Sequence, residues 1–253
     1  MRILVIGDVC NDVYVYGQCN KMCPDAPIPV FVPLYQKVNM GMAGNVFENL
    51  VSLGVTAELK CNDNTITKTR YVEKSKNHML LRVDSGEETI KRIDDLKVEE
   101  LSLYDAIIIS DYDKGYLKEE DIKFICDNHP LVFLDTKKII GDYCKNCSFI
   151  KINSLEFESS FGLFNNPSHS WAKDKMIVTL GSKGCRFKDK HYKVEEVAIK
   201  DTSGAGDTFL ASFVYRYLQT RNVEKALVFA NECSTIVVQK KGVNTIGKQK
   251  DKK

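Results

Sequence analysis

The feature that most constrains this chain is a series of short, unbroken apolar runs. The runs consist mainly of Ile, Val and Leu and lack the alternation of half-exposed strands, so they predict parallel strands covered on both faces. They lie at Ile3–Ile6, Ala106–Ile109, Leu131–Leu134, Phe149–Ile152 and Met176–Leu180. Helix-like stretches alternate with them, at Val46–Leu53, Lys118–Asn128 and Leu155–Phe161. We therefore expect an α/β fold in which a mostly parallel central sheet lies between two layers of helices.

A polar or flexible residue follows each apolar run directly. These residues are Gly7 with Asp8, Ser110 with Asp111, Asp135, Asn153 and Gly181. Since ligands of open α/β sheets bind beyond the carboxyl ends of the strands, the pattern predicts a functional edge of the sheet. The alternative is that polar residues simply begin loops, which would account for some of them.

Two segments do not fit the layered pattern. Pro24–Leu34 holds four of the six prolines around a short β-like run, and Thr67–Val83 reads as a hairpin that turns near Ser75–Asn77. Because proline favours edge strands over central ones, both segments predict a small separate sheet lying over the ligand edge. We expect one domain, residues 1–253, with this small sheet formed by segments at about 13–35 and 66–84.

Charge and hydropathy exclude several classes of protein. The chain has 36 basic and 34 acidic residues, and this near balance predicts no strong field for nucleic acid or for an anionic membrane. No apolar run approaches the ~20 residues that a membrane span needs, and the start has no signal-peptide pattern. A cytoplasmic location is the expectation. The lysine-rich end, Lys248–Lys253, is interpreted as a solvated tail, with a nucleic-acid-binding arm as the alternative.

The chain contains nine cysteines, an odd number in a sequence that is neither short nor secreted in character. Free thiols in a reducing compartment are the better interpretation. Cys144 and Cys147 form a C-x-x-C pair, and a zinc site is the alternative, but the other close pair, Cys19 and Cys23, is far away in sequence.

The sharpest local signal is Asp201–Asp207, with the sequence D-T-S-G-A-G-D. Its small residues lead into a helical stretch, Thr208–Leu218, and the N–H groups of a helix N-terminus attract anions. Such a turn can stabilise charge on a transferring phosphoryl group, and Asp207 in the first turn can accept a proton from an attacking hydroxyl. The alternative is a capping loop in which Asp207 only complements the helix dipole. No Walker A motif and no G-x-G-x-x-G motif after the first strand occur.

The segment D-T-S-G-A-G-D-T-F resembles the C-terminal signature of the ribokinase-like, or PfkB, carbohydrate kinases. Other motifs of that family have counterparts along nearly the whole chain, at Gly7–Gly17, Gly41–Asn45, Asn153–Glu156 and Val178–Gly184. The resemblance implies a three-layer ribokinase-like fold with a small β-sheet lid. It also implies an ATP-dependent kinase that phosphorylates a hydroxyl of a sugar or sugar phosphate.

Further motifs are similar to those of one branch, the D-glycero-β-D-manno-heptose-7-phosphate kinases. They are the P-D-A-P-I-P-V block from Pro24, Thr65–Arg70, Leu80–Asp84 and Ser110–Gly115. That branch phosphorylates heptose 7-phosphate at C1, which gives heptose 1,7-bisphosphate.

The resemblance assigns roles by position. Asp207 would be the general base, and the anion hole would be formed by Gly204, Ala205 and Gly206. Asn153 and Glu156 would organise Mg²⁺ and the phosphates of ATP, with Glu156 acting on the metal indirectly. The other nucleotide contacts would come from Thr179, Gly181, Gly184 and Asn231.

On the substrate side, the resemblance implies two groups of residues. The sugar hydroxyls would be held by Asp8, Asp12, Gly41 and Asn45. The substrate phosphate would be bound by cations, because a dianion needs cationic donors; the candidates are Lys68, Arg70, Arg82 and Lys114. The lid would also form a homodimer interface.

Three departures from the family pattern matter for function. Met42 replaces a glycine expected near the sugar. Only Lys60–Asn64 separates a strand-like segment from the T-I-T-K motif, where relatives carry a further helix and strand, so the sheet should have a new edge. The sequence stops soon after Thr245, and the expectation is a kinase without a fused nucleotidyltransferase domain. These departures leave two alternatives open: a kinase for another sugar or nucleoside, and a non-catalytic protein that binds nucleotide or sugar.

Overall fold

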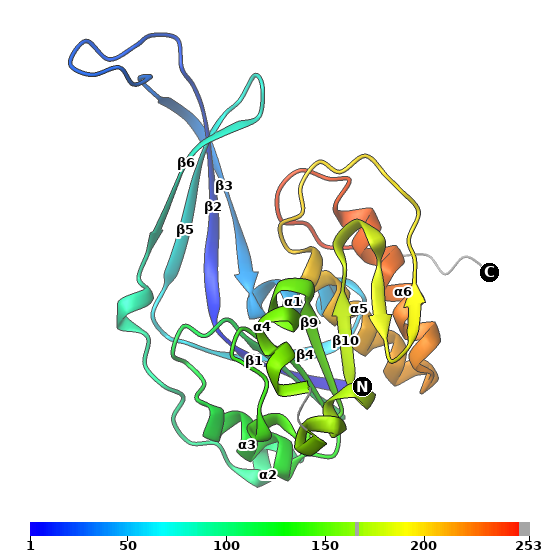
Figure 1. Ribbon diagram of the computed structural model, residues 1–253. Helices are drawn as coiled ribbons and strands as arrows, with labels where there is room; N and C mark the ends of the chain where they lie inside the picture. Colours follow the sequence, from blue (N-terminus) through cyan, green and yellow to red (C-terminus); the bar gives the residue numbers. More distant parts are fainter. Residues whose placement is uncertain (165–166, 248–253) are drawn as a thin grey trace.

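The computed structural model describes residues 1–164 and 167–247 and contains an eight-stranded main sheet with the order β12-β11-β10-β9-β8-β7-β1-β4 (Figure 1). The strands are β1 (Arg2–Gly7), β4 (Thr56–Cys61), β7 (Ala106–Asp111), β8 (Val132–Thr136), β9 (Phe149–Asn153), β10 (Met176–Thr179), β11 (Cys185–Phe187) and β12 (Lys190–Tyr192). All neighbours pair in parallel except β10 with β11 and β11 with β12. The five expected strands and the mostly parallel sheet are therefore confirmed.

Helices cover both faces of the main sheet. One layer contains α1 (Ala43–Ser52), α5 (Ala205–Thr220) and α6 (Val223–Val237), and the other contains α2 (Val98–Leu101), α3 (Glu119–Asn128) and α4 (Ser154–Phe164). Successive side chains of a strand point to opposite faces, so Ile3 and Val5 of β1 pack with the first layer while Leu4 and Ile6 pack with the second. Burial on both faces explains why the strands read as continuous apolar runs. Four 3₁₀ turns complete the helical elements: η1 (Glu87–Thr89), η2 (Asp142–Cys144), η3 (Pro167–Asp174) and η4 (Gly181–Lys183).

A second, four-stranded sheet projects from the carboxyl edge of the main sheet (Figure 1). Its order is β3-β2-β5-β6, with the strands β2 (Val9–Gln18), β3 (Val32–Met42), β5 (Ile66–Glu73) and β6 (His78–Ser85). The expected hairpin is β5–β6, with its turn at 74–77. The proline-rich segment differs from expectation: β3 begins only at Val32, and most of the preceding prolines lie in a loop. Proline lacks the N–H that a ladder requires, which explains the late start.

The edge strand of the main sheet is β4, which pairs with β1. Its charged side chains are engaged locally. Glu58 accepts from Arg2 at 2.6 Å, and Lys60 Nζ donates to both carboxylate oxygens of Glu100 on α2. Charges on an edge strand disfavour pairing with another chain, so this edge of the main sheet is protected.

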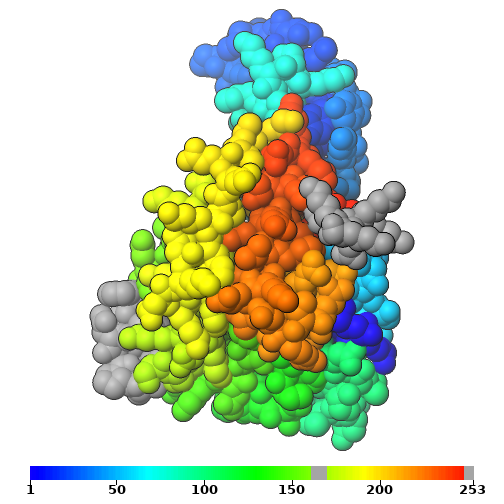
Figure 2. Space-filling view, turned by 90° about the vertical axis from the view of Figure 1, so that its right-hand side faces the viewer, coloured from blue at the N-terminus to red at the C-terminus, as the bar shows by residue number. Residues whose placement is uncertain are grey.

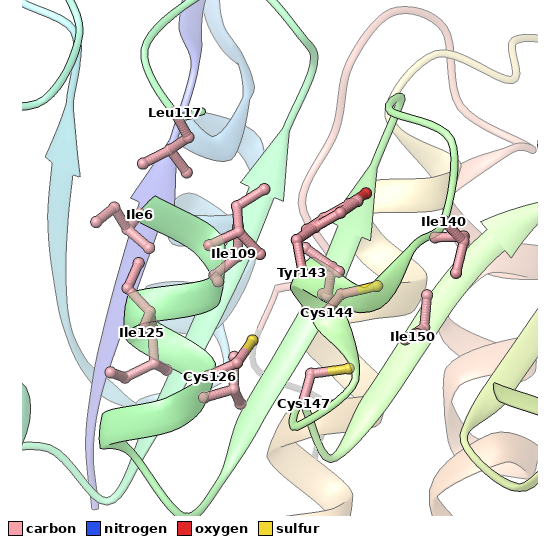
Figure 3. Packing of buried hydrophobic residues seen from close by; sticks show 14 of the residues in the cluster. Ile6, Ile109, Leu117, Ile125, Cys126, Ile140, Tyr143, Cys144, Cys147 and Ile150 are labelled. Atoms are coloured by element: carbon pink, nitrogen blue, oxygen red, sulfur yellow. The ribbon is translucent and has the colours of Figure 1, made fainter. Parts of the chain in front are cut away.

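The core of the second layer contains three buried cysteines, Cys126 of α3 and Cys144 and Cys147 around η2 (Figure 3). Burial raises the pKa of the Cys144 thiol to about 12, so it is not a reactive thiolate. All nine cysteines are free thiols, and residues 1–164 and 167–247 hold no group of three His, Cys, Asp or Glu side chains that could bind a metal. Within the same ranges no helix has the length and apolar character to cross a membrane. The lysine-rich tail, Lys248–Lys253, lies outside the described residues.

Candidate active site

A cavity of about 710 Å³ opens at the carboxyl edge of the main sheet, between β9, β10, the segment after β12, and α6. Figure 2 shows this segment (yellow) lying beside α6 (orange to red), the two elements that flank the cavity. Most of the residues predicted to contact the nucleotide or form the anion hole line it, namely Asn153, Thr179, Gly181, Gly184, Ala205, Gly206 and Asn231. The fold thus brings these residues from four separate segments of the chain to one cavity.

The predicted anion hole is the turn before α5. Gly204 has a positive φ of 77° and precedes Ala205, so Ala205, Gly206 and Asp207 form the first turn of the helix, three residues earlier than expected. A Cβ on Gly204 would lie 2.4 Å from Asn45 Nδ2, and one on Gly206 would lie 3.0 Å from Lys151 Nζ. The positive φ and the close contact with Asn45 favour glycine at position 204, whereas a Cβ at position 206 would only require the Lys151 ammonium to shift slightly. Ala205 and Gly206 lie at the cavity wall.

The Asp207 carboxylate is buried at the foot of this turn, with 4% of the residue exposed. Asn45 Nδ2 donates to its Oδ2 at 3.0 Å, and the Tyr112 hydroxyl donates to its Oδ1 at 2.7 Å. Burial raises the pKa of Asp207 to about 6, although the bonds from Asn45 and Tyr112 act in the opposite direction. A carboxyl with such a pKa is ionised at neutral pH and remains a usable proton acceptor.

Two lysines that the sequence patterns did not single out also line the cavity, Lys137 and Lys151. Lys151 Nζ is 2.6 Å from Asp135 Oδ2, and both residues are buried, at 5% and 2% exposure. Lys137 forms an ion pair with Glu156. The available signal was a lysine inside an apolar run, F-I-K-I, since an unpaired charge is not buried in a sheet.

The substrate-side residues lie where the second sheet meets the main sheet. Asp12 Oδ1 accepts from Arg70 Nη1 at 2.5 Å, and Asp12 Oδ2 lies so close to Gly41 that a Cβ there would be 2.3 Å away. Asn45 donates to the Asp207 carboxylate. Asp12, Gly41 and Arg70 therefore lie together, and Asn45 lies beside Asp207.

The predicted phosphate-binding cations differ in their partners. Arg82 pairs with Asp84 at 2.5 Å, and Lys114 pairs with Glu87 at 2.7 Å. Among the four candidates Lys68 is the one with no ion pair to a described residue, and its ammonium lies 5.9 Å from the centre of the Tyr112 ring.

Asp8 is fully buried beneath the loop that follows β7. Its Oδ2 accepts from the backbone N–H of Tyr112 at 2.7 Å and of Lys114 at 3.3 Å, and its Oδ1 accepts from that of Tyr116 at 3.4 Å. The carboxylate therefore anchors this loop. A contact between Asp8 and the sugar stays a prediction.

A family model described as "pfkB family carbohydrate kinase" matches residues 45–250. The chain belongs to the pfkB family of carbohydrate kinases.

Two curated relatives of this pfkB-family kinase are named "Bifunctional protein HldE". The protein of Nitratiruptor sp. is 31% identical over 294 residues, with 96% of this chain and 63% of the relative covered. The protein of Helicobacter pylori is 29% identical over 300 residues, with 95% and 63% covered. The chain thus spans about 63% of the length of these relatives.

Two solved structures are similar in fold to this pfkB-family kinase. The nucleoside kinase of Methanocaldococcus jannaschii has a TM-score of 0.68 at 18% identity, over 98% of this chain and 94% of that one. The ribokinase of Arabidopsis thaliana, solved with ribose and ATP, has a TM-score of 0.67 at 15% identity, over 96% and 94%. These similarities confirm the ribokinase-like fold.

The family uses Mg²⁺ with ATP, so the residues near the phosphate path can be tested for their fit to this metal. Asn153 and Glu156 form a capping box for α4: Glu156 accepts from Asn153 N and Nδ2 at 2.8 and 2.7 Å, and Asn153 Oδ1 accepts from Glu156 N at 2.9 Å. With Lys137 also bound to Glu156, this set fits a metal that arrives with phosphate oxygens and acts through Glu156. It does not fit a metal held by protein ligands alone.

Met42, the departure from the family pattern, is the N-cap of α1 with φ 59° and ψ −133°. This backbone region favours glycine, so the methionine is strained. Its buried side chain packs with Cys10 and Ile66, and Tyr112 covers the same cluster. Apolar side chains therefore occupy part of the space beside Asp207 in this pfkB-family kinase.

Proposed function

We propose that this kinase transfers the γ-phosphoryl group of ATP to a hydroxyl of a sugar phosphate, namely heptose 7-phosphate, to give heptose 1,7-bisphosphate. Asp207 takes the proton as the O–H bond of the sugar breaks. The sugar oxygen then forms the new bond to phosphorus, and the bond between that phosphorus and the bridging oxygen breaks to release ADP. The observation that carries the proposal is the buried Asp207 carboxylate in the first turn of α5, next to the cavity.

The chain offers three positive features along the path of the phosphoryl group. The N–H groups of the turn Gly204–Gly206 lie at the positive end of the α5 dipole. Lys151 lies under Gly206, and Lys137 also lines the cavity. Such donors stabilise the charge of the transition state in a water-poor site. Bound Mg²⁺, acting through Glu156, would neutralise further phosphate charge.

The nucleotide site is proposed to be the cavity that contains Thr179, Gly181, Gly184 and Asn231. Gly184 has a φ of 87°, and its missing Cβ leaves the backbone of β12 free to pack close by. Asn231 Nδ2 donates to the Tyr192 carbonyl at 2.9 Å, which fixes α6 against β12 at the cavity wall. A cavity of this size suits a nucleotide.

The substrate assignment rests on the motifs similar to the heptose-7-phosphate kinase branch, with which the similarity to HldE proteins agrees. Asp12, Gly41 and Asn45 are proposed to hold the sugar. Asp8 is proposed to support the loop after β7, or to contact the sugar itself. Among the candidate cations we propose Lys68 as the first contact of the substrate phosphate, because it is not engaged in an ion pair with a described residue. Arg70, Arg82 and Lys114 would have to exchange a carboxylate partner for the phosphate.

The second sheet is proposed to be both a lid of the single kinase domain and a homodimer interface. Its outer strands β3 and β6 expose large apolar side chains: Val32, Leu34, Tyr35, Val38, Met79, Leu80, Leu81 and Val83. An exposed apolar set of this extent is typical of a protein interface. Light scattering of the wild type and of Leu81→Arg tests it, with a dimer that becomes monomeric as the expected result. We also place the reaction in the cytoplasm, in keeping with nine free thiols.

A substrate panel tests the function directly. Purified protein with ATP and Mg²⁺ is offered heptose 7-phosphate, ribose, fructose 6-phosphate and a nucleoside, and ADP release is measured. We expect turnover with heptose 7-phosphate and a loss of at least about 100-fold in Asp207→Asn. Turnover of another acceptor would replace the substrate while keeping the kinase. Full activity of Asp207→Asn would remove Asp207 from the base role, and ATP binding without any turnover would indicate a binding protein.

A further inference from the structure

Tyr112 makes a contact that no sequence motif assigned to it. Its hydroxyl donates to Asp207 Oδ1 at 2.7 Å, while Asn45 donates to Oδ2 from the other side at 3.0 Å. The two donors come from different elements, the loop after β7 and helix α1. Each carboxylate oxygen therefore has one protein donor and one remaining lone pair for a substrate hydroxyl.

The position of Tyr112 is fixed from its backbone. Its N–H donates to Asp8 at 2.7 Å, and the N–H groups of Lys114 and Tyr116 bind the same buried carboxylate. Three donors on one carboxylate hold this turn rigidly. The hydroxyl of Tyr112 is thus brought to Asp207 by Asp8, a residue at the end of β1.

The ring of Tyr112 is held as well. The ammonium groups of Lys68 and Lys137 lie 5.9 and 5.2 Å from the ring centre, within cation–π range. Met42 and Ile66 belong to the apolar cluster against which the ring packs. Lys68 comes from the second sheet, and Lys137 directly follows β8 of the main sheet. The ring therefore stands between the substrate side and the nucleotide cavity, which it also lines.

We propose that Tyr112 is a positioning residue for the base: its hydroxyl fixes the Asp207 carboxylate so that a free lone pair meets the acceptor hydroxyl, and Asp8 acts through it. This inference rests on the proposed role of Asp207. In this arrangement the phenol keeps its proton throughout, since burial and the nearby Asp207 charge raise the pKa of Tyr112 well above its ordinary value. The proton of the sugar goes to Asp207, and the phenol only donates a hydrogen bond.

The same contact tunes the acidity of Asp207. A donor stabilises the ionised carboxylate, so loss of the hydroxyl must move the pKa of Asp207 further upward. We expect the other groups around Asp207 to keep their positions when Tyr112 is replaced by phenylalanine. The titratable and charged groups that face Asp207 are Tyr112, Lys151, Asp135, Lys137 and Cys10.

Tyr112→Phe keeps the ring and its packing and removes only the hydroxyl. The matched control is Tyr116→Phe, in the same turn, whose hydroxyl makes no bond to Asp207. The Asp207 carboxyl is titrated by ¹³C NMR in protein labelled at aspartate, with Asp207→Asn to assign the signal. We expect a higher titration midpoint in Tyr112→Phe, an unchanged midpoint in Tyr116→Phe, and a lower midpoint when 3-fluorotyrosine, a stronger donor of unchanged shape, replaces Tyr112.

Kinetics on the acceptor found in the substrate panel provide the second readout. We expect kcat to fall about tenfold in Tyr112→Phe with little change in KM for ATP. The acid limb of kcat/KM should move to higher pH. An unchanged NMR midpoint together with an unchanged acid limb in Tyr112→Phe would overturn the inference about Tyr112. The proposed function would still stand in that case if Asp207→Asn is inactive. An active Asp207→Asn would instead overturn the role of Asp207 as the base. If Tyr112→Phe fails to fold, the fluorotyrosine protein decides, because an unchanged midpoint there also contradicts the inference.

Discussion

Replacement of Lys151 with methionine removes the buried ammonium that lies next to the anion turn. The side chain of methionine has a similar length and fills the same space without a charge. In the wild type, Lys151 Nζ is 2.6 Å from Asp135 Oδ2 and close beneath Gly206. If the proposed function is correct, the change acts on two properties at once, the stability of the sheet and the stabilisation of the transferring phosphoryl group.

The structure sets the size of the stability loss. Asp135 is 2% exposed, and within the described part of the chain its Oδ1 has no hydrogen-bond donor. Without Lys151 its charge is left uncompensated in the core, which costs about 3–5 kcal/mol of unfolding free energy. For a chain of this size the melting temperature should fall by roughly 6–20 °C. Neutralising the partner in Lys151→Met/Asp135→Asn should recover more than half of this loss.

Thermal denaturation and kcat separate the two properties. The double variant should be folded yet slower than the wild type by about 10²–10³-fold, as for the loss of one donor in an oxyanion hole. Lys138→Met is the matched control, because Lys138 forms a similar pair with the buried Asp111, at 3.0 Å to both oxygens, but does not line the cavity. It should lose stability and keep kcat. A wild-type kcat in the double variant, or an unchanged melting temperature in Lys151→Met, would refute the reasoning.

Three further outcomes follow from single residues. Because Asp207 must be ionised to accept a proton, kcat/KM should fall below about pH 6, and a profile flat to pH 5 would contradict this. The pKa of Asp207 in the folded protein lies above its unfolded value, so its contribution to stability is present below about pH 4 and is lost as pH rises through 6. In thermal scans, Asp207→Asn should therefore be more stable than the wild type by roughly 1–3 kcal/mol at pH 8 and equally stable near pH 4. Gly184→Ala should lose more than about 2 kcal/mol of unfolding free energy in urea denaturation, because its Cβ would lie 2.1 Å from the Tyr192 carbonyl oxygen. Gly181→Ala, at φ 59° with open space around it, should lose only about 1–2 kcal/mol. Equal losses in the two variants would show that the contact with Tyr192 is unimportant.

The residues that the sequence identified correctly carry a local signal. The run Ile3–Ile6 predicted a buried strand because strands covered on both faces need apolar side chains in succession. The turn Gly204–Gly206 predicted a helix start because small residues are tolerated where the backbone is tightly packed or φ is positive. Both signals are properties of the segment itself and need no knowledge of its neighbours.

Lys151 and Tyr112 show what the sequence could not supply. The lysine lies in an apolar run, and nothing in that run reveals that Asp135 of the neighbouring strand neutralises it. Tyr112 lies within the motif Ser110–Gly115, but its hydrogen bond to Asp207 joins residues 95 positions apart. Asp8 was assigned to the sugar by position, and the fold shows it binding the backbone of the Tyr112 turn.

By itself, then, the sequence determined the alternating strands and helices, the parallel sheet and the glycine turn that begins the helix of Asp207. These features follow from periodicity and from the conformational needs of glycine at one place in the chain. Only the tertiary structure decided which donors hold Asp207, which cation is buried beside the turn, and that Lys68 is not engaged in an ion pair with a described residue. The physical reason is that hydrogen bonds and charge pairs depend on distance in space, and the crossing connections of the sheet bring distant segments together at one edge.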